Sequence, residues 1–214
     1  MKRYILSFFP LFILSFLFSS CLFDDKELFE ESAAERIEHA VEADRALLEG
    51  ATEGWQLQLY TGTNYSGGGY TMFLTFRDGK VRVSGDIAPD SMVCQSSYDI
   101  ARDQGPVLTF NTYNPILHLL AEPSASALSG MQGDYEFVIQ RATQDSLYLK
   151  GKKFGNKHVM TRLAPGTSVQ KTIQQMQYIV QHVGGYFASD NDYLVVDPST
   201  RRIYFGNQDI NGTP

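Results

Sequence analysis

The feature that most constrains the fold of this chain is a series of short segments in which apolar and polar residues alternate. In the first, Trp55, Leu57 and Leu59 alternate with glutamines. Alternation with period two is the pattern of a β-strand that buries one face. The segments are residues 55–59, 70–76, 81–83, 97–102, 107–112, 135–140, 146–151 and 158–163. About eight short strands at roughly 10–14-residue spacing predict a mainly β fold, an antiparallel barrel or sandwich.

Two segments with helical spacing flank the predicted strands. Residues 26–50 carry apolar side chains at helical spacing and glutamates on the opposite face, which predicts an N-terminal helix. A second helix is expected after Ser168, and Gly184 marks its end. A hairpin across residues 197–200 should follow.

These elements divide the chain into parts. We expect residues 27–165 to form the N-terminal helix plus the antiparallel β domain. Residues 166–214 would form a helix–hairpin segment. A lone hairpin is marginal in water, so this segment is expected either to begin a second module that the sequence cuts short or to pack on the first domain.

Composition excludes several classes of protein. Apolar residues make up 43 % of the 214 residues, enough for a sizeable core. The 24 acidic residues outnumber the 18 basic ones, and the net charge of −6 argues against a nucleic-acid partner, which requires a basic face. Two cysteines cannot make a disulfide framework. Cys94 is expected to be a free, half-buried thiol.

The N-terminus has the pattern of a secretion signal. Lys2 and Arg3 precede an apolar run over residues 4–18, which is shorter than the roughly 20 residues of a membrane-spanning helix. Residues 17–21, Leu-Phe-Ser-Ser-Cys, resemble a bacterial lipobox, with Phe18 where leucine is usual. We therefore predict a signal peptide over residues 1–20 and lipidation of Cys21. An ordinary signal peptide followed by a chance cysteine is the alternative.

The residues after the cysteine indicate where such an anchor would lie. Residues 21–26 would form the anchor and a linker, and Asp24, Asp25 and Glu27 make an acidic cluster. This cluster resembles the surface-export signal of Bacteroidetes lipoproteins. The expected location is the outer membrane, with the membrane contacted through the lipid and the protein facing the cell exterior. An acidic first turn of a helix explains the same residues.

No motif in the sequence indicates catalysis. The chain has no HExxH, CxxC or GxSxG pattern, and its four histidines lack metal-ligand spacing. We therefore predict no enzyme, no cofactor and no metal site. A hydrolase whose carboxylate or metal site is assembled only in three dimensions is the alternative.

The first candidate binding group is the loop from Tyr60 to Tyr70. Three tyrosines stand there among Gly, Ser, Thr and Asn residues. Aromatic faces beside amides and hydroxyls suit carbohydrate rings, which offer CH faces and hydroxyl edges. Tyr60, Tyr65 and Tyr70 are therefore predicted to bind a glycan, although tyrosines of β-rich proteins are often only structural.

The second candidate group is the only basic cluster of this acidic chain. It consists of Lys150, Lys152, Lys153 and Lys157. A phosphate loop is excluded, because such a loop leads into a helix and ends in GK[ST], whereas here a strand follows. We expect contact with an anionic glycan or an anionic lipid headgroup, or else a solvated hairpin tip.

Several longer strings resemble a known family. They are residues 26–36, 53–55, 103–115, 133–137 and 150–156. In this order after a lipobox, they resemble a Bacteroidetes lipoprotein family called domain of unknown function 4302. The resemblance covers residues 21–163 well and the remainder more loosely, and it implies a chain longer than this one.

The resemblance brings no catalytic residues with it. It implies an accessory component of an outer-membrane nutrient-uptake complex of the starch-utilisation type. The predicted function is therefore a surface lipoprotein with a non-catalytic binding or accessory role in glycan capture. A hydrolase and an interaction subunit of an envelope complex are the alternatives.

Overall fold

The computed structural model describes residues 31–123, 128, 130–189 and 192–207. The chain divides into two compact units, Met1–Glu35 and Arg36–Pro214. In the first unit, Ser32 and Glu35 form a capping box. The Ser32 hydroxyl accepts the Glu35 amide at 3.3 Å, and the Glu35 carboxylate accepts the Ser32 amide at 2.9 Å. This reciprocal pair is typical of a helix start, and helix α2 spans Ala33–Glu49.

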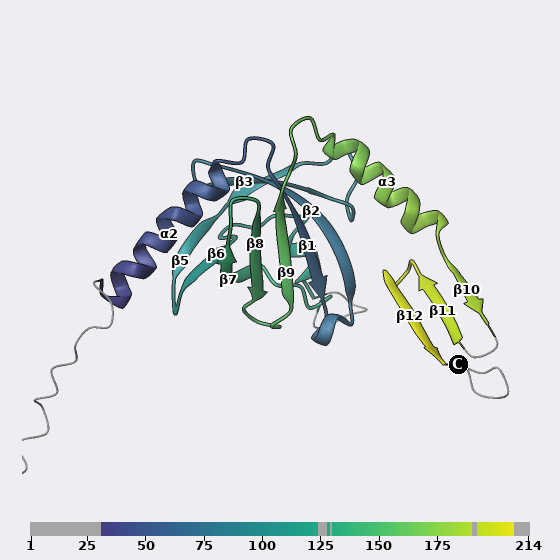
Figure 1. The fold of residues 1–214 in the computed structure, drawn as a ribbon. Helices are drawn as coiled ribbons and strands as arrows, with labels where there is room; N and C mark the ends of the chain where they lie inside the picture. The colour runs from purple at the N-terminus through teal and green to yellow at the C-terminus, as the bar shows by residue number, and fades with distance from the viewer. Residues whose placement is uncertain (1–30, 124–127, 129, 190–191, 208–214) are drawn as a thin grey trace, which may run out of the picture. The chain divides into compact units, whose positions relative to one another are not determined.

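The predicted β domain is a nearly closed antiparallel sheet of nine strands (Figure 1). The strands are β1 Trp55–Thr61, β2 Gly68–Arg77, β3 Lys80–Gly85, β4 Cys94–Ser97, β5 Asp99–Arg102, β6 Pro106–Thr109, β7 Glu136–Ala142, β8 Ser146–Gly151 and β9 Lys157–Arg162. Their order in the sheet is β4-β3-β2-β1-β9-β8-β7-β6-β5. The edge strands β4 and β5 are therefore consecutive in the chain, which brings the two edges of the sheet together as in a barrel.

The ninth strand arises where the sequence predicts one strand over residues 97–102. The structure has two strands there, separated by Tyr98, which is 3 % exposed. The Tyr98 amide donates to the carbonyl of Gly79 at 3.2 Å, and its hydroxyl donates to the Glu49 carboxylate at 2.6 Å. Its ring packs edge-on against the ring of Phe76, with the two ring centroids 4.7 Å apart. These bonds hold the chain at the corner where it passes from one edge of the sheet to the other.

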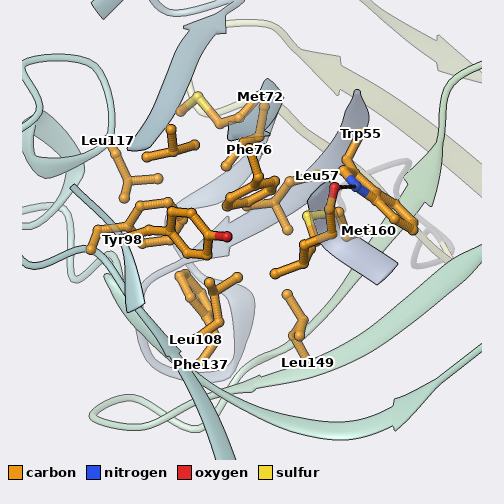
Figure 2. Close-up of a cluster of buried hydrophobic side chains, with 14 of the residues drawn as sticks. Trp55, Leu57, Met72, Phe76, Tyr98, Leu108, Leu117, Phe137, Leu149 and Met160 are labelled. Atoms are coloured by element: carbon orange, nitrogen blue, oxygen red, sulfur yellow. Dashed lines mark hydrogen bonds between the residues drawn. The ribbon is translucent and has the colours of Figure 1, made fainter. Parts of the chain in front are cut away.

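The inward faces of the strands make one hydrophobic core. Figure 2 shows Trp55 and Leu57 of β1, Phe137 of β7 and Met160 of β9 within one cluster of buried side chains. Trp55 is fully buried, and its indole N–H donates to the carbonyl of Leu48 in α2 at 3.0 Å. Alternation along the strands therefore predicted this core correctly, because every second residue faces the interior.

A loop closes part of the core between β6 and β7. It contains the short 3-10 helix η3, His118–Leu120, and buries three apolar side chains, those of Ile116, Leu117 and Leu120. Asn114 is fully buried, and its Oδ1 accepts the amides of Ile116 at 3.1 Å and Leu117 at 3.3 Å. The amide side chain thereby starts this turn in the way that an N-cap starts a helix.

The C-terminal elements are helix α3, Val169–His182, and a three-stranded antiparallel sheet of β10 Gly185–Ala188, β11 Asp192–Asp197 and β12 Arg202–Asn207. The predicted helix and hairpin are thus present, with one further strand. Ser168 occupies the N-cap position, but its side chain makes no capping bond. Among the described residues of this sheet whose side chains are placed, none is buried.

Two further properties concern the cysteine thiol and the two helices. Cys94 is a half-buried free thiol, as the sequence predicted. Within the described ranges, neither helix has the length and apolar character that crossing a membrane requires.

Candidate functional site

The two groups of candidate binding residues are brought together by one buried asparagine. Asn156, at the tip of the β8–β9 hairpin, is 3 % exposed. Its Nδ2 donates to the carbonyls of Gly62 at 2.8 Å and Tyr60 at 3.3 Å, and its Oδ1 accepts the Tyr65 amide at 3.3 Å. The hairpin is therefore fastened to the loop between β1 and β2, which lies more than ninety residues earlier in the chain.

Tyr65 lies at the centre of this junction. Its side chain is 43 % exposed, and its hydroxyl accepts the backbone N–H of Lys157 at 3.2 Å. The ring meets Tyr60 edge-on with centroids 5.6 Å apart. Asn64 and Tyr65 both have left-handed backbone, with φ of 52° and 65°. For a bulky residue this conformation is strained and persists only where surrounding contacts hold it, as they do here.

Tyr60 and Tyr70 face different sides of the sheet. The Tyr60 ring covers Gly69 on the neighbouring strand, where a Cβ would lie 3.1 Å from its Cε1. Tyr70 pairs with Leu59, belongs to the inward face and is only 7 % exposed. The structure therefore brings Tyr60 and Tyr65 together at the surface and places Tyr70 in the core.

All four predicted lysines are exposed on the β8–β9 hairpin. Lys152 pairs with Asp103 at 3.2 Å, and the ammonium of Lys153 lies 4.9 Å from the ring centroid of Phe154. Lys150 and Lys157 are direct partners across the two strands, and within the described residues neither has an ion-pair partner. Like charges directly opposite each other destabilise a sheet, so an anion placed between them would relieve that repulsion.

Asp134 holds the tip of the hairpin in place, a role that no sequence motif indicated. The carboxylate is 3 % exposed and accepts the amide of Lys153 at 2.7 Å and that of Phe154 at 3.3 Å. Gly151 leaves space for it, because a Cβ there would lie 2.1 Å from Oδ2. Burial raises the pKa of Asp134 above its ordinary value, against the lowering effect of these two hydrogen bonds.

His158 supports Tyr60 from inside the sheet. The imidazole is 1 % exposed, and its Nδ1 accepts the Tyr60 amide at 3.1 Å. Phe137 contacts it edge-on, and among the described residues Nε2 has no hydrogen-bond partner. Burial lowers the pKa of His158 to about 4. The ring is therefore neutral near pH 7, with its proton on Nε2, and it acts as an acceptor for the backbone.

A second exposed aromatic group escaped the sequence analysis. Tyr113 and Tyr135 are 56 % and 41 % exposed, and both contact the ring of His118, at centroid distances of 5.4 Å and 5.0 Å. The Tyr113 hydroxyl donates to Glu122 at 3.1 Å. No signal in the sequence indicated this group, because the alternation of Tyr135 with Phe137 and Ile139 predicted that Tyr135 faces inward, and Tyr113 follows the predicted strand 107–112.

Metal ligands are not clustered in the part of the chain that the structure describes. No three His, Cys, Asp or Glu side chains there gather in a way that could hold a metal ion. Cys21, predicted to carry the lipid, lies outside the described residues, as does the signal peptide over residues 1–20.

Comparison with known proteins identifies the family. A family model described as Domain of unknown function (DUF4302) matches residues 25–213. The chain belongs to this family. No curated protein and no solved structure matches the chain. The DUF4302 match extends over the N-terminal helix, the nine-stranded sheet and the C-terminal elements alike.

Proposed function

We propose that this DUF4302 chain is a lipid-anchored binding module of the outer membrane that captures an anionic glycan. The binding site is the surface formed by Tyr60, Tyr65, Lys150 and Lys157, which we call the tyrosine–lysine surface. One observation carries the proposal: the hydroxyl of exposed Tyr65 accepts the amide of Lys157. This bond holds an exposed aromatic ring next to the backbone of Lys157, which is the cross-strand partner of Lys150.

The chemistry of the two residue types fits an acidic sugar. A tyrosine ring offers an apolar face to the CH face of a sugar ring and a hydroxyl to its edge. A carboxylate or sulfate group between Lys150 and Lys157 would neutralise two like charges that face each other across the ladder. Exposed ion pairs contribute only about 0.2–1 kcal/mol each. Affinity for one sugar unit should therefore be weak and should fall as salt is added.

The anchor is the second part of the proposal. It is supported by the lipobox-like residues 17–21 and the acidic residues that follow. We propose that the lipid on Cys21 holds the module at the outer membrane, on the exterior side, as an accessory to a nutrient-uptake complex. The sheet then acts as a scaffold, and its loops supply the binding residues.

Binding of purified protein to polygalacturonate and to a neutral glucan, measured by isothermal titration, tests the glycan proposal. We expect binding to the acidic polymer only. Tyr65→Ala and the double variant Lys150→Gln/Lys157→Gln should each weaken it by tenfold or more, on the order of 1.4 kcal/mol. Tyr148→Ala is the matched control, because Tyr148 is an exposed tyrosine of the same hairpin, 39 % exposed.

Two results would contradict the proposal. One is equal affinity for the acidic and the neutral polymer. The other is unchanged affinity in the double lysine variant, provided that its thermal unfolding midpoint matches that of the wild type. An anionic lipid headgroup shares the chemistry of an acidic sugar, so vesicles with and without phosphatidylserine serve as the second ligand. Binding to those vesicles alone would exclude the glycan.

A further inference from the structure

The turn between β11 and β12 places an arginine in a buried site on the nine-stranded sheet. The Arg201 Nη1 lies 2.7 Å from Oδ2 of Asp86, and its Nη2 donates to the Asp86 carbonyl at 3.4 Å. The guanidinium carbon lies 4.5 Å from the ring centroid of Tyr70. The side chains of Arg201 and Asp86 are only 16 % and 7 % exposed. The contact is therefore a largely desolvated ion pair with a cation–π partner.

The half of the site that lies on the sheet is held by residues other than Arg201. The Asp86 amide donates to the carbonyl of Thr71 on β2 at 3.1 Å, which fixes the carboxylate next to that strand. Tyr70 is 7 % exposed and packs in the core. Gly68 leaves space for the incoming turn, because a Cβ there would lie 2.2 Å from the carbonyl oxygen of Thr200.

Arg201 uses only part of this site. A guanidinium group can donate to both oxygens of a carboxylate at once. Here Arg201 reaches Oδ2, whereas Oδ1 of Asp86 is buried and has no hydrogen-bond partner among the described residues. Arg201 has left-handed backbone, with φ of 53°, in a turn held by Asp197, whose carboxylate accepts the Ser199 amide at 2.9 Å. The tether to this turn explains why the second oxygen stays unused.

We propose that Asp86 and the ring of Tyr70 form a guanidinium-binding site, which Arg201 fills from within the chain and which another guanidinium group can take in its place. An untethered guanidinium can donate to both carboxylate oxygens, including the one that Arg201 leaves without a partner. The source of the group, a small molecule or an arginine of another protein, does not alter this chemistry. The proposal does not depend on glycan binding.

Displacing Arg201 would free the turn. No described side chain of β10–β12 is buried, and near Arg201 the turn is otherwise held by the bond from Arg202 to the Ser66 carbonyl, at 3.3 Å, and by the close packing on Gly68. Occupation of the site by an outside ligand should therefore loosen the β11–β12 turn from the nine-stranded sheet.

Thermal unfolding of Arg201→Gly with butylguanidinium chloride tests the proposal. Glycine suits the left-handed backbone of position 201, so the substitution empties the site without backbone strain. At ten times its dissociation constant, butylguanidinium should raise the unfolding midpoint by about 3–5 °C. Butylammonium chloride and sodium chloride at equal concentration should not. Arg202→Gly, the matched control on the same turn, should show a clearly smaller rise, because Arg201 still competes for the site.

A loss of the effect in Arg201→Gly/Asp86→Asn would locate the ligand at the carboxylate. An unchanged midpoint of Arg201→Gly with butylguanidinium would overturn the proposal, and so would an equal rise with butylammonium. If Arg201→Gly does not fold, Arg201→Lys replaces it, because lysine keeps the charge but lacks the planar guanidinium group. The same rise in unfolding midpoint with butylguanidinium, and the same dependence on Asp86, are then required. Arginine amide and an arginine-containing peptide, tested afterwards, distinguish a small ligand from a protein partner.

Discussion

The buried imidazole of His158 should make the protein lose stability as the pH falls. Its pKa is lowered to about 4 by burial, whereas an unfolded histidine has a pKa of about 6.5. Between these values the unfolded chain binds more protons than the folded chain, so the free energy of unfolding decreases on acidification. The difference of about 2.5 units corresponds to about 3 kcal/mol. Above both pKa values the effect vanishes.

Titration of Asp44 changes the free energy of unfolding in the opposite direction over the same pH range. Its side chain is buried in helix α2, which raises its pKa to about 6. A carboxyl group with a raised pKa binds its proton earlier in the folded state, so acidification from about pH 6 to about pH 4 stabilises the fold, also by roughly 3 kcal/mol. Burial shifts Asp86 and Asp134 the same way. The pH profile of the wild type alone therefore cannot isolate His158, because these carboxyls oppose its effect.

The comparison that isolates His158 is between the wild type and His158→Gln. Glutamine does not titrate, and its carbonyl oxygen can still accept the Tyr60 amide. Urea unfolding at steps from about pH 7.5 to about pH 4 gives the difference in unfolding free energy between the two proteins. Between about pH 7.5 and about pH 4, we expect the wild type to lose about 3 kcal/mol of unfolding free energy relative to His158→Gln. A shift below about 1 kcal/mol would falsify the argument that burial keeps the imidazole neutral.

In the Asp44→Asn background, which lacks one of the opposing carboxyls, urea unfolding should show a larger loss of stability on acidification than in the wild type. Asp134→Ala removes the acceptor for the amides of Lys153 and Phe154. The free energy of unfolding, measured by urea titration, should therefore fall by about 1–3 kcal/mol. The affinity for polygalacturonate should fall severalfold, although Asp134 lies outside the proposed binding surface. Asp134→Asn keeps an acceptor oxygen and should restore most of both, and equal losses in the two variants would contradict the role assigned to it. Cys21→Ala should move the protein from the membrane fraction to the soluble fraction of its cells, as followed by immunoblot, and unchanged fractionation would refute lipidation.

Local patterns predicted the strands because each strand is specified by its own alternation. Trp55, Leu57 and Leu59 are all buried, and the Asp78–Gly79 turn joins β2 to β3 through two left-handed residues. The same alternation already placed Tyr70 with Met72 and Leu74 on the inward face of β2. The period of the strand, and not the composition of the loop before it, therefore decides that Tyr70 faces the core.

Other features depend on contacts that no local pattern contains. The corner at Tyr98 exists because β4 and β5 pair with β3 and β6, on opposite edges of the sheet. The bond from the Lys157 amide to Tyr65 requires β1 to lie next to β9, although their sequences are about a hundred residues apart. Strand β10 is four residues long and begins with glycine, which made it too short for an alternating pattern.

The charge of the chain limits how an anionic ligand can be captured. Because its net charge is −6, the protein as a whole repels a polyanion at long range. Lys150 and Lys157 act only within about one Debye length, roughly 8 Å at physiological salt. Added salt should therefore have two effects on polygalacturonate binding. It screens the long-range repulsion and so raises the association rate. It also screens the attraction between the polymer and the two lysines, which raises the dissociation rate. A basic protein of the same affinity would show the opposite change in association rate. Stopped-flow kinetics at two salt concentrations thus distinguish capture by a local lysine pair from attraction by the whole molecule.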